Sequence, residues 1–184
     1  MNKKSLYVLG FAALFSSSAA LAYSDQNNGL TEEKVLAAQE AWGAALIQIS
    51  QDYAEGGLEK ATSTASAVLD QAYGYALGPV LFKPTLASGD TTFRTTQEGA
   101  LAYFVGGNSD FPDSGFALKG WQEFTFENAA VFINDNVAMT MGHVMLTNAD
   151  GEITTVDKTW GFFKDDEGDL RIVLHHSSLP FSAE

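Results

Sequence analysis

The 184-residue chain contains no cysteine. Disulfide bonds, thiolate nucleophiles and cysteine-ligated zinc sites are therefore excluded. A chain of this length can bury a sizeable core without covalent cross-links. We therefore expect one domain that is stabilised by packing.

Basic residues are also scarce. Ten Lys and Arg stand against 23 Asp and Glu, for a formal net charge of −13. Proteins that bind nucleic acids or anionic membranes contact phosphates through Lys and Arg, so this composition argues against both partners. A small anion remains compatible, because it responds to its local pocket. The motifs of serine hydrolases, HExxH metalloproteases, phosphate loops and dinucleotide-binding loops are absent as well.

The first 22 residues have the pattern of a secretory signal peptide. Lys3 and Lys4 give a positive start, residues 6–15 are apolar, and Ala20-Leu21-Ala22 supplies the small residues that a signal peptidase reads. The apolar segment is too short to span a bilayer, which needs about 20 residues. We predict cleavage after residue 22, one mature domain over residues 23–184, and a periplasmic or secreted location.

The first half of the mature chain predicts helices. A helix over residues 31–57 starts with Thr31 as its cap and stops at two glycines. A second helix, rich in small residues, covers 58–73. A shorter one over 95–107 opens with Thr95 as the cap of a capping box and ends at another glycine pair.

The last sixty residues predict a β-meander. Four segments with strand-like composition are separated by short Asn-, Asp- and Gly-rich turns: WQEFTFENAAV, NVAMTMGHVMLTN, TTVDKTWGFFKD and DLRIVLHHSSL. A shorter strand is expected at VLFKPT, residues 80–85. Helices first and an antiparallel meander last indicate an α+β fold. The arrangement that fits is a curved antiparallel sheet wrapped around the N-terminal helices, the cone of the NTF2-like proteins.

Two of the three histidines stand together in LHHSSLP, residues 174–180. In a regular strand, alternation places His176 and Ser178 on one face and His175 and Ser177 on the other. Leu170, Ile172 and Leu174 share the first face, so we expect His176 and Ser178 to point into the cone. These two residues are either functional or simply hydrogen-bonded core groups.

A metal site is the alternative use of the histidines. Adjacent histidines on opposite faces of a strand cannot both bind one metal there, which weakens a zinc site made of His143, His175 and His176. Arg94 either anchors an anion or pairs with an acidic residue. The residues alone leave both questions open.

Several stretches resemble one family when they are taken in order. They are VLFKPTLA at 80–87, FRTTQEGALAYFVGGN at 93–108, GFALKGW at 115–121, FEN at 126–128, AMTMGHVMLT at 138–147 and LRIVLHHSSLPF at 170–181. The chain resembles the iota-class carbonic anhydrases of the bacterial type, which are related to the association domain of calcium/calmodulin-dependent kinase. The resemblance covers roughly residues 42–181.

The resemblance implies interconversion of carbon dioxide and bicarbonate in the pocket of the cone. The implied pocket residues, with catalytic and substrate-binding roles, are Thr85, Tyr103, His176 and Ser178. We expect apolar walls and a nearby positive charge from Phe82, Phe93, Phe104 and Arg94. It further implies catalysis without a metal, with zinc or manganese as the alternative. We also expect a homodimer, because relatives of this fold pair through their sheets. The competing functions are a non-catalytic periplasmic binder of a small molecule and an oligomerisation module.

Overall fold

The computed structural model describes residues 29–182. The predicted signal peptide lies outside this range, so it stays a prediction. Within residues 29–182, neither helix combines the length and the apolar character that crossing a membrane requires.

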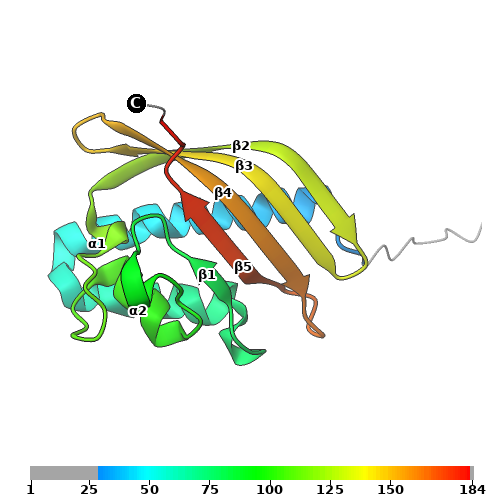
Figure 1. Cartoon of the computed structure of the whole chain (residues 1–184), viewed down its shortest axis with the longest axis horizontal. Helices are drawn as coiled ribbons and strands as arrows, with labels where there is room; N and C mark the ends of the chain where they lie inside the picture. The colour runs from blue at the N-terminus through cyan, green and yellow to red at the C-terminus, as the bar shows by residue number, and fades with distance from the viewer. Residues whose placement is uncertain (1–28, 183–184) are drawn as a thin grey trace, which may run out of the picture.

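The first element is the long helix α1 (Glu32–Ala72). The Thr31 side chain accepts a hydrogen bond from the Lys34 backbone, which confirms the predicted cap. Gly57 interrupts the helix with φ of 68°, a conformation that favours glycine. The chain turns there, so α1 consists of the two predicted helical segments (Figure 1).

The short helix α2 (Gln97–Val105) is confirmed, with one correction. Its cap is Thr96, whose side chain accepts from the Gly99 backbone, rather than Thr95. The helix therefore begins one residue later than the capping-box pattern predicted. It ends at Gly106, again with φ of 68°.

Five strands form one curved sheet in the order β1-β5-β4-β3-β2 (Figure 1). Their bounds are β1 (Leu81–Lys83), β2 (Trp121–Asn134), β3 (Val137–Asn148), β4 (Ile153–Lys164) and β5 (Leu170–Ser178). Strands β2 to β5 make the predicted antiparallel meander. Strand β1 pairs with β5 in parallel, so the sheet is mixed and not wholly antiparallel as we expected.

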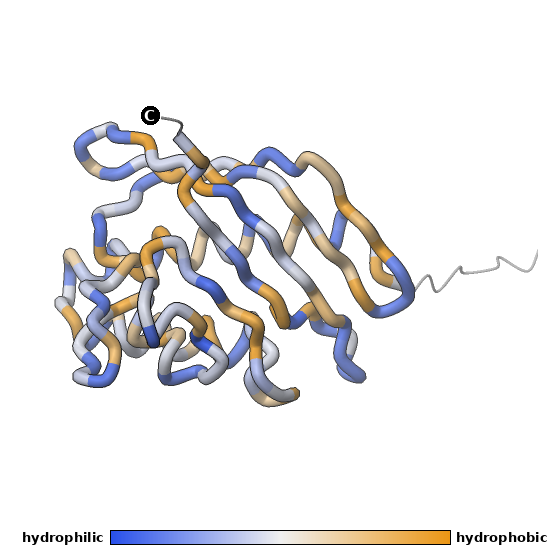
Figure 2. The backbone as a smooth tube through the Cα atoms, viewed as in Figure 1, coloured by the Kyte–Doolittle hydropathy of each residue, from blue (hydrophilic) through white to orange (hydrophobic). Residues whose placement is uncertain are grey.

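One face of the sheet packs against α1 and forms the core. Hydrophobic and polar residues alternate along the strands, as Figure 2 shows. The inward side chains of β4 are Val156, Lys158, Trp160 and Phe162, all buried. A lysine therefore stands in an otherwise apolar row, and it faces α1.

Candidate active site

The structure buries His175 and Ser177 and leaves His176 exposed. The side chains of His175 and Ser177 point toward α1, and each residue is 2 % exposed. Ser178 is half-buried on the opposite face. The predicted orientation of His176 and Ser178 is therefore wrong.

A β-bulge in β5 explains the error. Phe162 pairs with Ile172, but the preceding Gly161 pairs with Leu174, so Val173 is an extra residue in β5. An inserted residue reverses the alternation of every side chain beyond it. Leu170 and Ile172 face the core before the bulge, and His175 and Ser177 face it afterwards.

Both ring nitrogens of His175 are engaged by buried groups. The Tyr73 hydroxyl lies 2.8 Å from Nδ1, and Lys158 Nζ lies 2.6 Å from Nε2. The indole N–H of Trp42 donates to the Tyr73 oxygen at 3.0 Å. These four side chains come from α1, from the residue that follows it, and from β4 and β5, and they form one hydrogen-bonded chain through the core.

Burial determines the charge states of these hydrogen-bonded side chains. It lowers the pKa of Lys158 to about 7 and places the pKa of His175 well below its usual value, with Lys158 as the next contribution. Burial also raises the pKa of Tyr73 far above its usual value. Lys158 Nζ lies 4.5 Å from the centre of the Trp42 ring system and 5.1 Å from that of Trp160. These cation–π contacts favour the protonated amine, in opposition to burial.

Three hydroxyls gather next to His175. Thr85, after β1, donates to the Ser177 oxygen at 2.8 Å. The Tyr103 hydroxyl approaches from α2. Thr85 and the Leu86 backbone lie close enough to lower the pKa of Tyr103, although neither forms a hydrogen bond with its hydroxyl. Burial outweighs them and raises the pKa of Tyr103 strongly. Its hydroxyl is thus a protonated donor, buried and unpartnered among residues 29–182.

Aromatic rings surround Tyr103 and His175. Two of the three phenylalanines that we expected as apolar walls, Phe82 and Phe104, are among them. Phe82 stacks on His175 with ring centroids 4.4 Å apart and meets Tyr103 edge-on at 5.7 Å. Phe104 stacks on Phe82 at 5.9 Å. Phe93, however, is 70 % exposed and lines a surface depression with His176. The prediction that Phe93 lines the interior is wrong.

Arg94 is buried in an ion pair. Its NH2 nitrogen lies 3.0 Å from the Asp113 carboxylate, and its guanidinium sits over the Phe111 ring at 4.6 Å. Nε and NH1 of Arg94 have no hydrogen-bond partner in the described part of the chain. The Asp113 carboxylate also contributes to raising the pKa of Tyr103, so the Arg94–Asp113 ion pair lies near the Tyr103 hydroxyl. Its carboxylate offsets the positive charge that we expected Arg94 to offer the substrate.

The alternative metal ligands are not brought together. His143 lies on the outer face of the sheet, where Nε2 contacts the Asp157 carboxylate at 3.3 Å. His176 shares that face, whereas His175 is inside with both nitrogens engaged. Among residues 29–182, no three His, Asp or Glu side chains form a potential metal site. The ligand set His143, His175 and His176 is therefore wrong.

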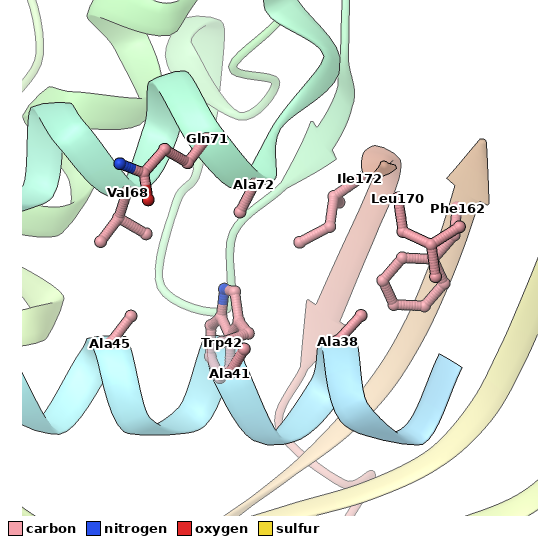
Figure 3. Close-up of a pocket in the computed structure, with 10 residues that line it drawn as sticks. All are labelled: Ala38, Ala41, Trp42, Ala45, Val68, Gln71, Ala72, Phe162, Leu170 and Ile172. Atoms are coloured by element: carbon pink, nitrogen blue, oxygen red, sulfur yellow. The ribbon is translucent and has the colours of Figure 1, made fainter. Parts of the chain in front are cut away.

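A separate apolar pocket of about 250 Å³ adjoins the hydrogen-bonded chain (Figure 3). The two segments of α1 and the ends of β4 and β5 line it, and Trp42 projects into it. Gln71 is the only amide side chain among its lining residues. This pocket suits an apolar molecule, but it lacks the several donors that a bicarbonate ion needs.

Sequence reasoning missed four residues of the site: Lys158, Tyr73, Trp42 and Ser177. A signal for Lys158 was available, because it interrupts an apolar alternation in VDKTWGF. Its burial follows from that alternation. Tyr73 and Trp42 carry no such signal, because aromatic residues on a helix normally indicate core packing.

Comparisons with known proteins agree with this architecture. The chain matches the model of a family described as metal-independent carbonic anhydrase over residues 33–179. It is 58 % identical over 156 residues to a metal-independent carbonic anhydrase from Nostoc sp. strain PCC 7120, covering 84 % of this chain and 76 % of the relative.

Comparison with solved structures identifies the fold. The crystal structure of a cyanobacterial iota-carbonic anhydrase complexed with bicarbonate superposes with a TM-score of 0.84 at 57 % identity, covering 85 % of this chain and 96 % of that one. An NTF2-like family protein from Streptomyces avermitilis shares the fold alone, with a TM-score of 0.51, 13 % identity and coverage of 82 % and 96 %. The chain thus has the α+β NTF2-like fold and belongs to the metal-independent, iota-class carbonic anhydrases.

Proposed function

We propose that this enzyme interconverts carbon dioxide and bicarbonate at the interior site formed by Thr85, Tyr103, Ser177 and His175, without a metal ion. One observation carries the proposal. The unpartnered Tyr103 hydroxyl and the Thr85–Ser177 pair lie together beside the buried rings of Phe82 and Phe104, close to the one buried histidine of residues 29–182. The cyanobacterial relative, at 57 % identity, was crystallised with bicarbonate.

The surroundings suit both forms of the substrate. Carbon dioxide is apolar and gains by contact with the rings of Phe82 and Phe104. Bicarbonate is a planar anion and needs hydrogen-bond donors. Thr85 donates to Ser177, which leaves the Ser177 hydroxyl proton free to turn toward the anion. Tyr103 supplies a second donor, and donors in a water-poor site stabilise developing negative charge strongly.

Tyr103 acts as a donor and not as the base. Because burial raises its pKa, its hydroxyl keeps its proton throughout the neutral range. The water that attacks carbon dioxide must nevertheless lose a proton. A group with a pKa near neutrality is required for this step.

Export and dimerisation are further parts of the proposal. The signal-like N-terminus supports a periplasmic or secreted enzyme. The exposed hydrophobic side chains of β2 and β3, such as Phe132, Met139 and Met141, offer a surface for a second copy. Both remain predictions.

Replacing Tyr103 tests the site. We expect Tyr103→Phe to lower kcat for carbon dioxide hydration by about 10²-fold, the effect of losing one preorganised donor. Stopped-flow measurement with a pH indicator reads this rate. The control is Tyr53→Phe, which removes the same hydroxyl from a tyrosine that is 42 % exposed on α1. A folded Tyr103→Phe protein with the wild-type rate would disprove this arrangement of donors.

A further inference from the structure

In the described part of the chain, Lys158 is buried without a carboxylate partner. It is 5 % exposed, and no ion pair involves it among residues 29–182. A buried ammonium normally requires a counter-ion, because removing its charge from water is costly. The polar atom that meets Nζ is Nε2 of His175, at 2.6 Å. The two groups therefore do not both carry a full proton complement.

We propose that Lys158 and His175 act as one proton-accepting pair, in which Lys158 carries the added proton and His175 stays neutral and changes its tautomer. The inference rests on the proposed function. It assigns to the pair the proton that water releases when it adds to carbon dioxide.

The hydrogen-bonded chain has two arrangements that differ by one proton. In the neutral arrangement, Trp42 donates to Tyr73, Tyr73 donates to Nδ1 of His175, and Nε2–H donates to a neutral Lys158 amine. In the charged arrangement, the Lys158 ammonium donates to Nε2. The Nδ1–H then donates to Tyr73, whose oxygen has two lone pairs and also accepts from Trp42. The imidazole stays neutral in both arrangements and changes its tautomer.

The surroundings make both arrangements accessible. Burial favours the neutral amine, while the Trp42 and Trp160 rings favour the ammonium. The other titratable groups near the pair are Tyr73, which hydrogen-bonds to His175, Tyr103, which contacts Phe82 as His175 does, and Lys83, whose Nζ donates to the Ser177 carbonyl. His176, next to His175 in β5, lies on the outer face of the sheet. None of these is a carboxylate that would lock Lys158 in its charged form.

The pair adjoins the hydroxyls of the proposed site. Lys158 and Ser177 are directly paired in the β4–β5 register, and both side chains face inward. Directly paired residues have Cβ atoms about 4.5–5.5 Å apart. Ser177 also accepts the hydrogen bond from Thr85. A proton released among these hydroxyls thus has a short path through Ser177 to the pair.

The step balances in atoms and charge. The water oxygen bonds to the carbon of carbon dioxide, one C=O electron pair moves onto oxygen, and water gives up one proton. Bicarbonate leaves with one negative charge while the pair gains one positive charge. Buffer then removes the proton and restores the neutral arrangement.

Nuclear magnetic resonance of the whole protein tests the pair without reference to activity. With ¹⁵N-labelled histidine and His175→Asn for assignment, long-range ¹H–¹⁵N spectra from pH 5.5 to 9 report each ring nitrogen. We expect His175 to remain a neutral imidazole while its proton moves from Nε2 to Nδ1 as the pH falls. Lys158→Met should abolish this movement, whereas Lys119→Met, at an exposed lysine, should retain it. If the wild-type spectra showed that His175 keeps one tautomer throughout, or that it becomes an imidazolium, the inference would be overturned.

Activity gives the second readout. We expect Lys158→Met to lose about 10²-fold in kcat and to lose the neutral-pH inflection of the pH–rate profile. Lys119→Met should retain both. A Lys158→Met enzyme with the wild-type rate and profile would overturn the role of the pair while leaving the proposed function intact. An inactive wild type would disprove the proposed function, and the spectra would still decide whether the pair exists.

Discussion

We expect His175→Asn to lower kcat/KM for carbon dioxide hydration by about 10²–10⁴-fold, the usual contribution of a group that takes part in proton transfer. The reason is geometric. His175 lies inside the core between Tyr73 and Lys158, one inward position from Ser177. Asparagine removes the two ring nitrogens that connect these groups. Stopped-flow hydration assays across pH 6–9 measure the loss.

The neighbouring histidine is the matched control. His176 lies on the exposed outer face, so we expect His176→Asn to keep the wild-type kcat/KM. Near-ultraviolet circular dichroism establishes that the His175→Asn core is folded. A second variant, His175→Phe, refills the volume of the ring and should lose activity equally. If His176→Asn were inactive and His175→Asn active, the assignment of the inner face to catalysis would be refuted.

The buried lysine predicts an unusual pH dependence of stability. The pKa of Lys158 is about 7 in the folded protein and close to 10.5 when the chain unfolds. Between these values the unfolded chain binds a proton that the folded protein lacks. The free energy of unfolding therefore rises with pH in this window. We expect Lys158 to contribute a rise of about 2 kcal/mol between pH 8 and 9.5, at 1.36 kcal/mol per pH unit and proton.

Comparison with Lys158→Met isolates this contribution. Urea denaturation of both proteins at pH 8, 8.75 and 9.5 gives the two slopes, and Lys119→Met should follow the wild type. Burial also raises the pKa values of Tyr73, Tyr75 and Tyr103, which lowers stability as the unfolded tyrosines ionise near pH 10. Those groups are present in every variant and cancel in the difference. Parallel slopes for wild type and Lys158→Met would show that the amine is charged in the folded protein.

Most of the fold could be predicted because its signals are local. The Thr31 cap, the break at Gly57 and the four meander strands follow from capping chemistry, glycine conformation and period-two alternation. The parallel pairing of β1 with β5 could not be predicted in the same way. It joins segments about ninety residues apart, and nothing in a three-residue strand specifies its partner.

The site was predicted in part. Thr85 and Tyr103, which the family resemblance implied, lie close together, and the expected walls Phe82 and Phe104 are buried beside Tyr103; their roles stay predictions. The histidine and serine were each misplaced by one position, because alternation assumes a regular strand. The bulge at Val173 has no sequence signature in LRIVLHH, so the reversal of faces emerges only from the pairing of β4 with β5.

One measurement tests the central claim most directly: stopped-flow carbon dioxide hydration by the purified protein before and after exhaustive chelation, with metal content read on the same sample. The account predicts that hydration persists at the same rate with no stoichiometric metal, because the hydroxyls and the Lys158–His175 pair supply the donors and the proton acceptor. Activity that disappears on chelation and returns with added zinc would contradict it.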